Sequence, residues 1–106
     1  MNLRGGMGEL MRQASRMQRK VEKRREELKE ETFEASAGND KVTAIANGTP
    51  ELTEVRIDKG LLDEEGLDMV QDLVVAAANA ALTKARERVD QEIDKITGGL
   101  SIPGLG

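Results

Sequence analysis

Length, composition and charge narrow the classes of protein to which this chain can belong. It has 106 residues, no cysteine, no histidine and one aromatic side chain, Phe33. A domain of this size buries only about 60–65 % of the surface that its unfolded chain exposes, so self-association is a natural way to complete its core. Without cysteine or histidine there is no disulfide, thiolate nucleophile, Ser-His-Asp site or Cys/His metal site. We therefore expect no enzyme, no cofactor and no small-molecule substrate.

The charges are segregated along the chain, although the net charge is −4. Residues 1–29 hold nine Lys or Arg and four Glu, which gives +5, whereas residues 30–106 hold seven basic and sixteen acidic residues, which gives −9. A basic segment of this kind is compatible with a polyanionic partner even in an acidic protein. The first eight residues lack the apolar run of a signal peptide, and no stretch of about 18 apolar residues is present. The sequence thus predicts a cytoplasmic protein without a membrane partner.

The first long element is predicted to be a helix from about Met7 to Glu31, after a glycine-rich lead-in. Its apolar residues follow spacings of four, three, four and seven, which is the a/d pattern of a helix that packs against another helix: Leu10, Ala14, Met17, Val21 and Leu28. Arg24 occupies the slot of this seam that lacks an apolar residue. The narrow stripe predicts a partner helix.

Three short strands follow, over residues 32–37, 41–47 and 51–58. The turn signals Gly38-Asn39-Asp40 and Asn47-Gly48-Thr49-Pro50 separate them and predict an antiparallel meander. Alternation places the following residues on one face of the sheet: Phe33, Ala35, Ala37, Val42, Ala44, Ala46, Thr53, Val55 and Ile57. It places Ile45 and Leu52 on the other face.

Residues 61–66 are predicted to form a turn or a short helix, and a second long helix then runs to about Thr97, where Gly98 and Gly99 end it. The expected fold class is α+β, with an α-β-β-β-α protomer, a three-stranded antiparallel sheet and two long helices. We expect residues 1–106 to form one domain, with residues 1–6 and 98–106 flexible.

A strip of basic residues is the strongest candidate for a functional site. At about 100° per residue it falls on the side of the first helix roughly opposite the apolar seam, and it comprises Arg12, Arg16, Arg19, Lys20 and Lys23. The alternative interpretation is an ordinary solvated face. Arg16 and Lys20, however, have no acidic residue three or four positions away, and uncompensated like charges favour a polyanion such as DNA as the neighbour.

Other charged residues are weaker candidates. Arg24 and Arg25 continue the first helix, and Lys84, Arg86 and Arg88 form a smaller basic cluster on the second, where interspersed acids favour a solvated face. Carboxylates at residues 63–65 and 68 could in principle hold Mg²⁺, but their place at a helix start explains them, and we expect no metal site. Proteins that bind single strands stack the bases on aromatic side chains, which are nearly absent here. The sequence therefore favours the backbone of duplex DNA as the binding partner.

The chain resembles the YbaB/EbfC family of bacterial nucleoid-associated proteins over nearly its whole length. Four segments carry the resemblance: Gly5-Gly6-Met7-Gly8-Glu9-Leu10-Met11-Arg12-Gln13-Ala14 with Met17-Gln18, Asn47-Gly48, Val55-Arg56-Ile57-Asp58 with Leu61-Leu62, and Asp72-Leu73-Val74-Val75-Ala76-Ala77-Ala78-Asn79-Ala80-Ala81. The resemblance implies a tweezers-like homodimer built through the sheet region. It also implies duplex DNA binding through the helical arms, with roles in nucleoid organisation and gene regulation.

Two rival functions remain at this stage. The basic strip is also suited to a protein-interaction adaptor that docks on an acidic protein or on ribosomal RNA. An enzyme is the weaker rival, because the residues that most often supply acid-base and nucleophilic chemistry are missing.

Overall fold

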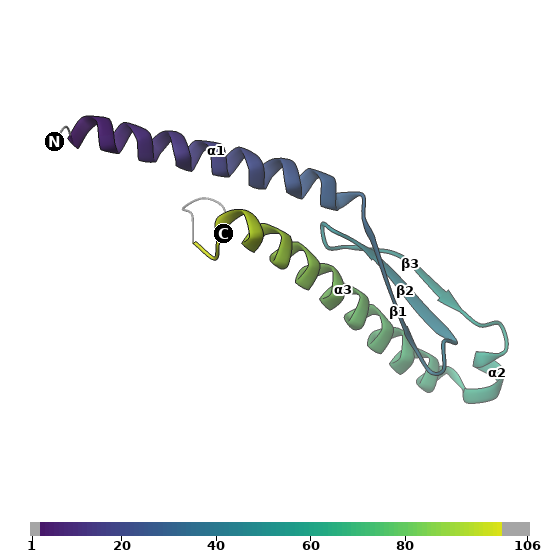
Figure 1. Ribbon diagram of the computed structural model, residues 1–106. Helices are drawn as coiled ribbons and strands as arrows, with labels where there is room; N and C mark the ends of the chain where they lie inside the picture. Colours follow the sequence, from purple (N-terminus) through teal and green to yellow (C-terminus); the bar gives the residue numbers. More distant parts are fainter. Residues whose placement is uncertain (1–2, 101–106) are drawn as a thin grey trace.

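The computed structural model describes residues 3–100 of the chain, and it shows the expected α-β-β-β-α order, with a short helix within the segment predicted to form a turn or a short helix. The elements are α1 (Leu3–Lys29), β1 (Thr32–Ala37), β2 (Val42–Asn47), β3 (Leu52–Ile57), α2 (Leu61–Glu65) and α3 (Leu67–Thr97). The principal extents are 75 × 19 × 18 Å. Figure 1 shows that α1 and the C-terminal half of α3 run side by side, and that the N-terminal half of α1 projects past the end of α3.

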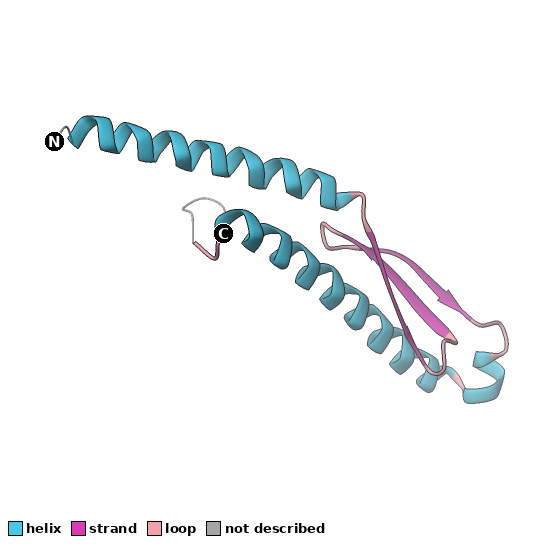
Figure 2. Cartoon of the chain, viewed as in Figure 1, coloured by secondary structure: helices cyan, strands magenta, loops and turns pink. Residues whose placement is uncertain are grey.

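The sheet is an antiparallel meander in the order β1-β2-β3, as predicted. Strand bounds agree with the sequence prediction to within one residue at each end, because turn signals flank every strand. Figure 2 shows the three strands lying along the first part of α3, with α2 at the turn that leads into it. The remainder of α3 is thereby free to meet α1.

One prediction about the sheet is wrong, and a β-bulge is the reason. Leu52 was expected on the face opposite Ala46, but the two residues pair directly and so point to the same face. The register shifts between Ile45 and Ala46, because Ile45 pairs with Glu54 and leaves Thr53 as an extra residue in β3. Thr53 is therefore not part of the regular alternation that continues through Val55.

The core lies between α3 and the inner face of β1 and β2. Alanines on both elements meet there: Ala77, Ala81 and Ala85 of α3 and Ala44 and Ala46 of β2 are fully buried. Small side chains on both surfaces allow the helix to approach the sheet closely, and Phe33 and Val42 fill the larger spaces. α3 packs on β1 and β2 much more than on β3. The inner face of β3 is thus left largely uncovered within the protomer.

The ends of the long helices were predicted unequally well. α3 ends at Thr97, as expected, because Gly98 takes a left-handed conformation (φ 64°) and donates its N–H to the Asp94 carbonyl at 2.7 Å. α1, in contrast, begins at Leu3 rather than near Met7, so its helical hydrogen bonds continue through the glycines. Flexibility was expected for residues 1–6 and 98–106. Residues 1–2 and 101–106 lie outside the described residues, and residues 3–6 belong to α1.

Within residues 3–100, no helix is both long enough and apolar enough to cross a membrane. Over the same residues, His, Cys, Asp and Glu side chains form no group of three or more with the arrangement of a metal site.

Candidate nucleic-acid interface

The apolar seam of α1 is divided into a packed half and a free half. Val21 and Leu28 are completely buried and Met17 is half-buried, whereas Leu10 and Ala14 are exposed. The partner helix that the seam requires is thus α3 of the same protomer, over the C-terminal half of α1. Residues 6–20 precede Val21, the first buried residue of α1, and we call this segment the arm.

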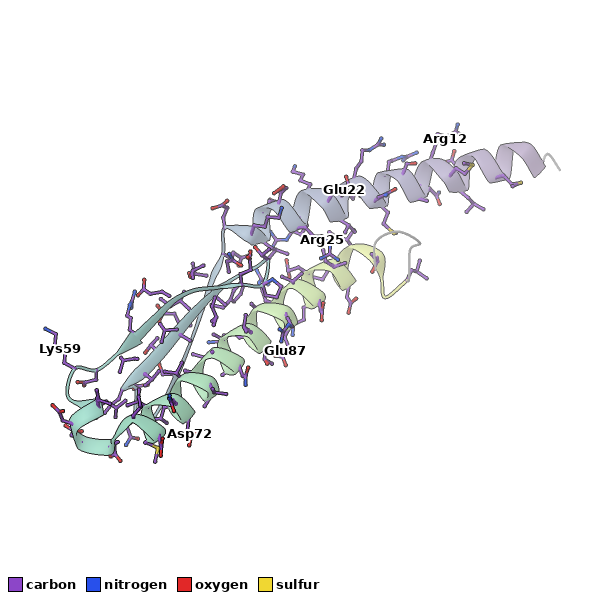
Figure 3. All side chains as sticks on the ribbon, turned by 180° about the vertical axis from the view of Figure 1, so that it is seen from behind. Arg12, Glu22, Arg25, Lys59, Asp72 and Glu87 are labelled. Carbon is purple, nitrogen blue, oxygen red and sulfur yellow. The ribbon has the colours of Figure 1, made fainter. Side chains whose placement is uncertain are left out.

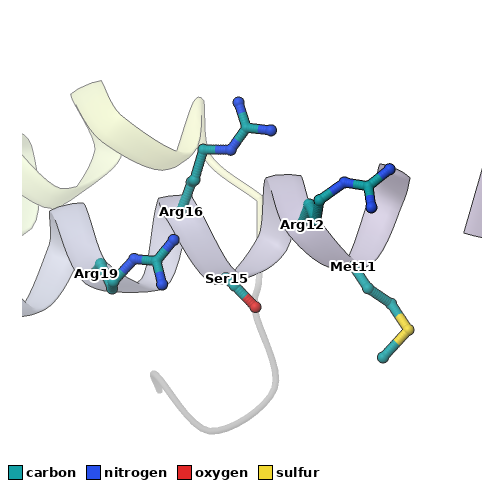
Figure 4. A pocket seen from close by; sticks show the side chains of 5 residues that line it. All are labelled: Met11, Arg12, Ser15, Arg16 and Arg19. Carbon is teal, nitrogen blue, oxygen red and sulfur yellow. The ribbon is translucent and has the colours of Figure 1, made fainter. Parts of the chain in front are cut away.

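All five residues of the basic strip are exposed. A shallow hollow on the arm is lined by three of its arginines, Arg12, Arg16 and Arg19, together with Met11 and Ser15. Figure 4 shows these arginines on successive turns of α1. The structure therefore brings Arg12, Arg16 and Arg19 together on an exposed surface of α1, and Arg16 and Lys20 line a second hollow with Ile96 of α3.

The ion pairs of the strip differ from those that the sequence suggests. Glu9 pairs with Arg12 at 2.9 Å, and its other oxygen lies 3.8 Å from Arg16, two helical turns further along. No salt bridge involves Arg19, Lys20 or Lys23 in the part of the chain that the structure describes, although acidic residues lie three or four positions from two of them. Exposed pairs such as Glu9 with Arg12 contribute about 0–1 kcal/mol each. They offer little resistance to an incoming phosphate.

The weaker candidates of α1 have neighbours of mixed charge. Arg25 lies with Glu22, Glu26 and Lys29 around one hollow on another side of the helix. Arg24 turns toward α3, where its Nη2 donates to Oε1 of Glu92 at 2.6 Å, and its side chain is 27 % exposed. The hydrogen bond to Glu92 raises the pKa of Arg24 above its ordinary value.

The three basic residues of α3 do not form one patch. Lys84 donates to the Glu34 carbonyl of β1 at 2.8 Å. Arg88 pairs with Glu92 at 2.9 Å and lies 3.5 Å from Glu31. Arg86 is exposed, about 200° around the helix from Lys84. Two of these residues thus have structural partners, and the third points elsewhere.

Sequence reasoning missed Glu92 as a residue that matters to the site. It accepts hydrogen bonds from Lys95 and Arg24 and lies beside Arg88, and these cations lower its pKa to about 2 against the opposing effect of its burial. The signal was present in the seam of α1, because an arginine among packed apolar residues needs a buried partner. The partner stands 68 residues away, so the sequence alone did not identify it.

One group of acidic residues lies at the opposite end of the molecule from the arm. α2 and its flanks carry Asp58, Asp63, Glu64, Glu65, Asp68 and Asp72. Figure 3 places Asp72 and Lys59 at this end and Arg12 on the arm. Lys41 pairs there with Glu64 at 2.7 Å, and this hydrogen bond raises the pKa of Lys41. One end of the fold is therefore rich in carboxylates, while the arm at the other end carries the arginines of the basic strip.

Comparison with known proteins agrees with the fold and with the resemblance inferred from the sequence. The YbaB/EbfC DNA-binding family matches residues 3–100, and the chain belongs to this family. Among curated relatives, a nucleoid-associated protein of Acetivibrio thermocellus is 50 % identical over 102 residues, covering 95 % of this chain and 90 % of that protein. A nucleoid-associated protein of Myxococcus xanthus is 43 % identical over 95 residues, covering 90 % of each.

A solved structure shares the fold. The crystal structure of an uncharacterized protein from Helicobacter pylori superposes with a TM-score of 0.56 at 20 % sequence identity, covering 80 % of this chain and 94 % of that one. At this level of identity the likeness concerns the arrangement of the helices and strands alone.

Proposed function

We propose that this protein is a non-enzymatic, nucleoid-associated protein that binds duplex DNA as a homodimer through its basic arms. In this proposal the protein is cytoplasmic and associated with the nucleoid, and its roles are nucleoid organisation and gene regulation. The observation that carries the proposal is the exposed basic strip along α1, which extends onto the half of the helix that projects past α3. Membership of the YbaB/EbfC DNA-binding family, and the names of the relatives from Acetivibrio thermocellus and Myxococcus xanthus, support it.

The geometry of the strip is suited to a phosphate backbone. Residues that recur every turn of an α-helix present charges about 5.4 Å apart, and arginine donates to phosphate with two parallel N–H groups. We expect Arg12, Arg16, Arg19, Lys20 and Lys23 to contact phosphates. Arg25 and Arg86 are secondary contacts, while Arg24, Lys84 and Arg88 keep their structural partners. Contacts of this kind give affinity without sequence readout.

Uncovered apolar surface supports the homodimer. On β3, Leu52, Val55 and Ile57 are 42 %, 39 % and 44 % exposed, although they point to the same face as the buried residues of β2. Lys84 donates a hydrogen bond to β1, so its side of α3 faces that strand. Val75 lies about 180° around α3 from Lys84 and is 60 % exposed. A second copy that covers this sheet edge would bury these side chains and bring two arms into one particle.

Binding of the purified protein to labelled duplexes of varied sequence, measured by fluorescence anisotropy over a series of salt concentrations, tests the proposal. We expect binding to plain duplex DNA that weakens steeply with salt and depends little on sequence. Failure to bind any duplex, together with tight binding to ribosomal RNA or to one acidic protein, would show instead that the chain is an interaction adaptor.

A further inference from the structure

A charged cluster joins α1 to α3 inside the seam between the two helices. One of the two carboxylate oxygens of Glu92 accepts from Arg24 of α1, at 2.6 Å from Nη2 and 3.2 Å from Nε. The other oxygen accepts from Arg88 at 2.9 Å and from Lys95 at 2.6 Å, both on α3 itself. The Glu92 side chain is only 10 % exposed. A single carboxylate is therefore held by its own helix and presented to the arginine of the other.

The segment between α1 and β1 completes this cluster. Glu31 lies there, with one oxygen 4.0 Å from Nη2 of Arg24 and the other 3.5 Å from Nε of Arg88. Two carboxylates and three cations thus alternate across the junction at which the arm leaves the body of the protein. We call this group of five residues the junction cluster.

The apolar contacts beside the cluster involve only a small part of α1. On α1 they consist of Val21 and Leu28, one on each side of Arg24, with Met17 half-buried beyond them. Small apolar surfaces of this kind tolerate sliding and rotation, whereas a polar residue at a single seam position fixes register and orientation. Arg24 occupies such a position, and Glu92 is its counterpart.

A small change of angle at the junction has a large effect on the arm. Arg12 is twelve residues from Arg24, which is about 18 Å along the helix, so that a rotation of about 10° at the cluster moves Arg12 by about 3 Å. A displacement of this size separates a guanidinium from a phosphate oxygen that it would otherwise reach.

We propose that Glu92 is a positioning residue for DNA binding, and that it holds the two arms of the dimer at the angle at which their basic strips meet the duplex together. The effect of Glu92 on DNA binding rests on the proposed function, whereas its effect on the angle of the arm concerns the protein without DNA. The two parts are therefore tested by separate measurements.

The arm angle is measured first, without DNA. The chain has no cysteine, so spin labels on Ser15→Cys and Asp90→Cys, both exposed, report the distance between the arm and α3 by pulsed electron resonance. An excess of unlabelled protein restricts the signal to pairs within one subunit. We expect one narrow distance distribution, broadened or shifted by Glu92→Gln and unchanged by Glu87→Gln, which removes the same charge from an exposed position on α3. A distribution that Glu92→Gln leaves narrow and in place would overturn the proposal.

DNA affinity is measured next, and here the sign of the effect is informative. Glu92→Gln removes one negative charge per subunit, so electrostatics alone would strengthen binding to DNA. We expect the opposite, a roughly two- to thirtyfold weaker affinity, the range for residues that modulate binding without touching the ligand, while Glu87→Gln binds as tightly as the unmodified protein or more tightly. Unchanged or stronger binding by Glu92→Gln would contradict the positioning role. No binding by the unmodified protein would instead contradict the proposed function, and the distance measurement would still decide the first part.

Both measurements are made well below the melting temperature, with helical content checked by circular dichroism. If Glu92→Gln does not keep its helical content, Glu31→Gln takes its place. This variant removes only the longer contacts of the junction cluster, at 4.0 and 3.5 Å. It should broaden the distance distribution to a smaller extent, and no broadening in this folded variant would count against the proposal.

Discussion

Ala44 and Val55 pair across β2 and β3 and point to the same face of the sheet, yet Ala44 is completely buried and Val55 is 39 % exposed. The difference arises because α3 lies over β1 and β2 and covers little of β3. Within one protomer, the inner face of the sheet is therefore completed on one side only. This asymmetry gives the proposed homodimer a definite location.

Replacing Val55 by Asp tests that location. An added carboxylate on this face would have to be desolvated in the interface, so we expect Val55→Asp to shift dimers to monomers in light scattering. The helical signal should be largely kept, because Val55 contributes little to the core of the protomer. Glu54→Asp, on the opposite face of the same strand, is the control and should remain dimeric. Equal dimer fractions for the two variants would mean that β3 lies outside the interface.

The sheet also shows how far sequence reasoning extends. Alternation and turn residues predicted all three strands and the shared face of Val55 and Ile57, since both signals are local. The bulge at Thr53 was not predicted, because an extra residue in one strand is decided by hydrogen bonding between strands. Here Thr53 donates its hydroxyl to the Ile45 carbonyl at 3.2 Å. This one extra residue in β3 turns Leu52 to the same face as Ala46, opposite to the face that alternation predicts.

Gly48 connects the β2–β3 turn to the end of α1 by close approach. A Cβ at Gly48 would stand 2.0 Å from the Leu28 carbonyl oxygen and 2.6 Å from its carbon. We expect Gly48→Ala to lower the free energy of unfolding by about 1–3 kcal/mol, since backbone must move to make room. A denaturant titration measures this change.

The same substitution on the arm should have the opposite sign. Nothing lies within 4 Å of a Cβ at Gly6, and Gly6 is helical. Gly6→Ala should therefore stabilise α1, by up to about 1 kcal/mol, because alanine loses less backbone entropy in a helix. If Gly48→Ala were as stable as Gly6→Ala, the turn and α1 would not be in contact as described.

The pH dependence of stability should reveal Glu92. Its pKa is lowered to about 2 in the folded protein by Lys95, Arg24 and Arg88, from 4.5 for an unperturbed glutamate. A carboxylate with a lowered folded pKa stabilises the protein above the unfolded value, and this contribution is lost as pH falls from about 4.5 toward 2. Thermal melts of the unmodified protein and of Glu92→Gln should thus differ most near neutral pH and converge in acid. A constant difference between pH 7 and pH 3 would show that the charge of Glu92 does not stabilise the fold.

The candidate interface could be predicted only in part, because some of its features are local to one helix and others depend on how the helices pack. The face of α1 that carries Arg12 and Lys23 follows from the helical period alone, and so does the slot of Arg24 in the seam. The projection of the arm past α3 does not, because it depends on where α3 ends relative to α1. The pairing of Arg24 with Glu92 likewise depends on packing between helices that lie far apart in the sequence.

Arg16 and Lys20 provide the most direct test of the basic strip. Each phosphate that a protein contacts releases condensed counterions, so the logarithm of affinity falls linearly with the logarithm of salt concentration, with a slope of about 0.9 per contact. Replacing both residues by alanine removes two charges per subunit and four per dimer. The slope should therefore fall by up to about 3.6, with the helix intact because alanine is a good helix former.

The matched control removes two positive charges at the far end of the molecule, with Arg56→Ala and Lys59→Ala. Net charge changes by the same amount in both double variants, but only the first pair lies on the arm. We expect the control to keep the salt slope and nearly all of the affinity. Since a nonspecific effect of net charge would act equally on both variants, equal losses would argue against contact by the strip. A loss confined to the control pair would place the DNA site at the opposite end of the protein.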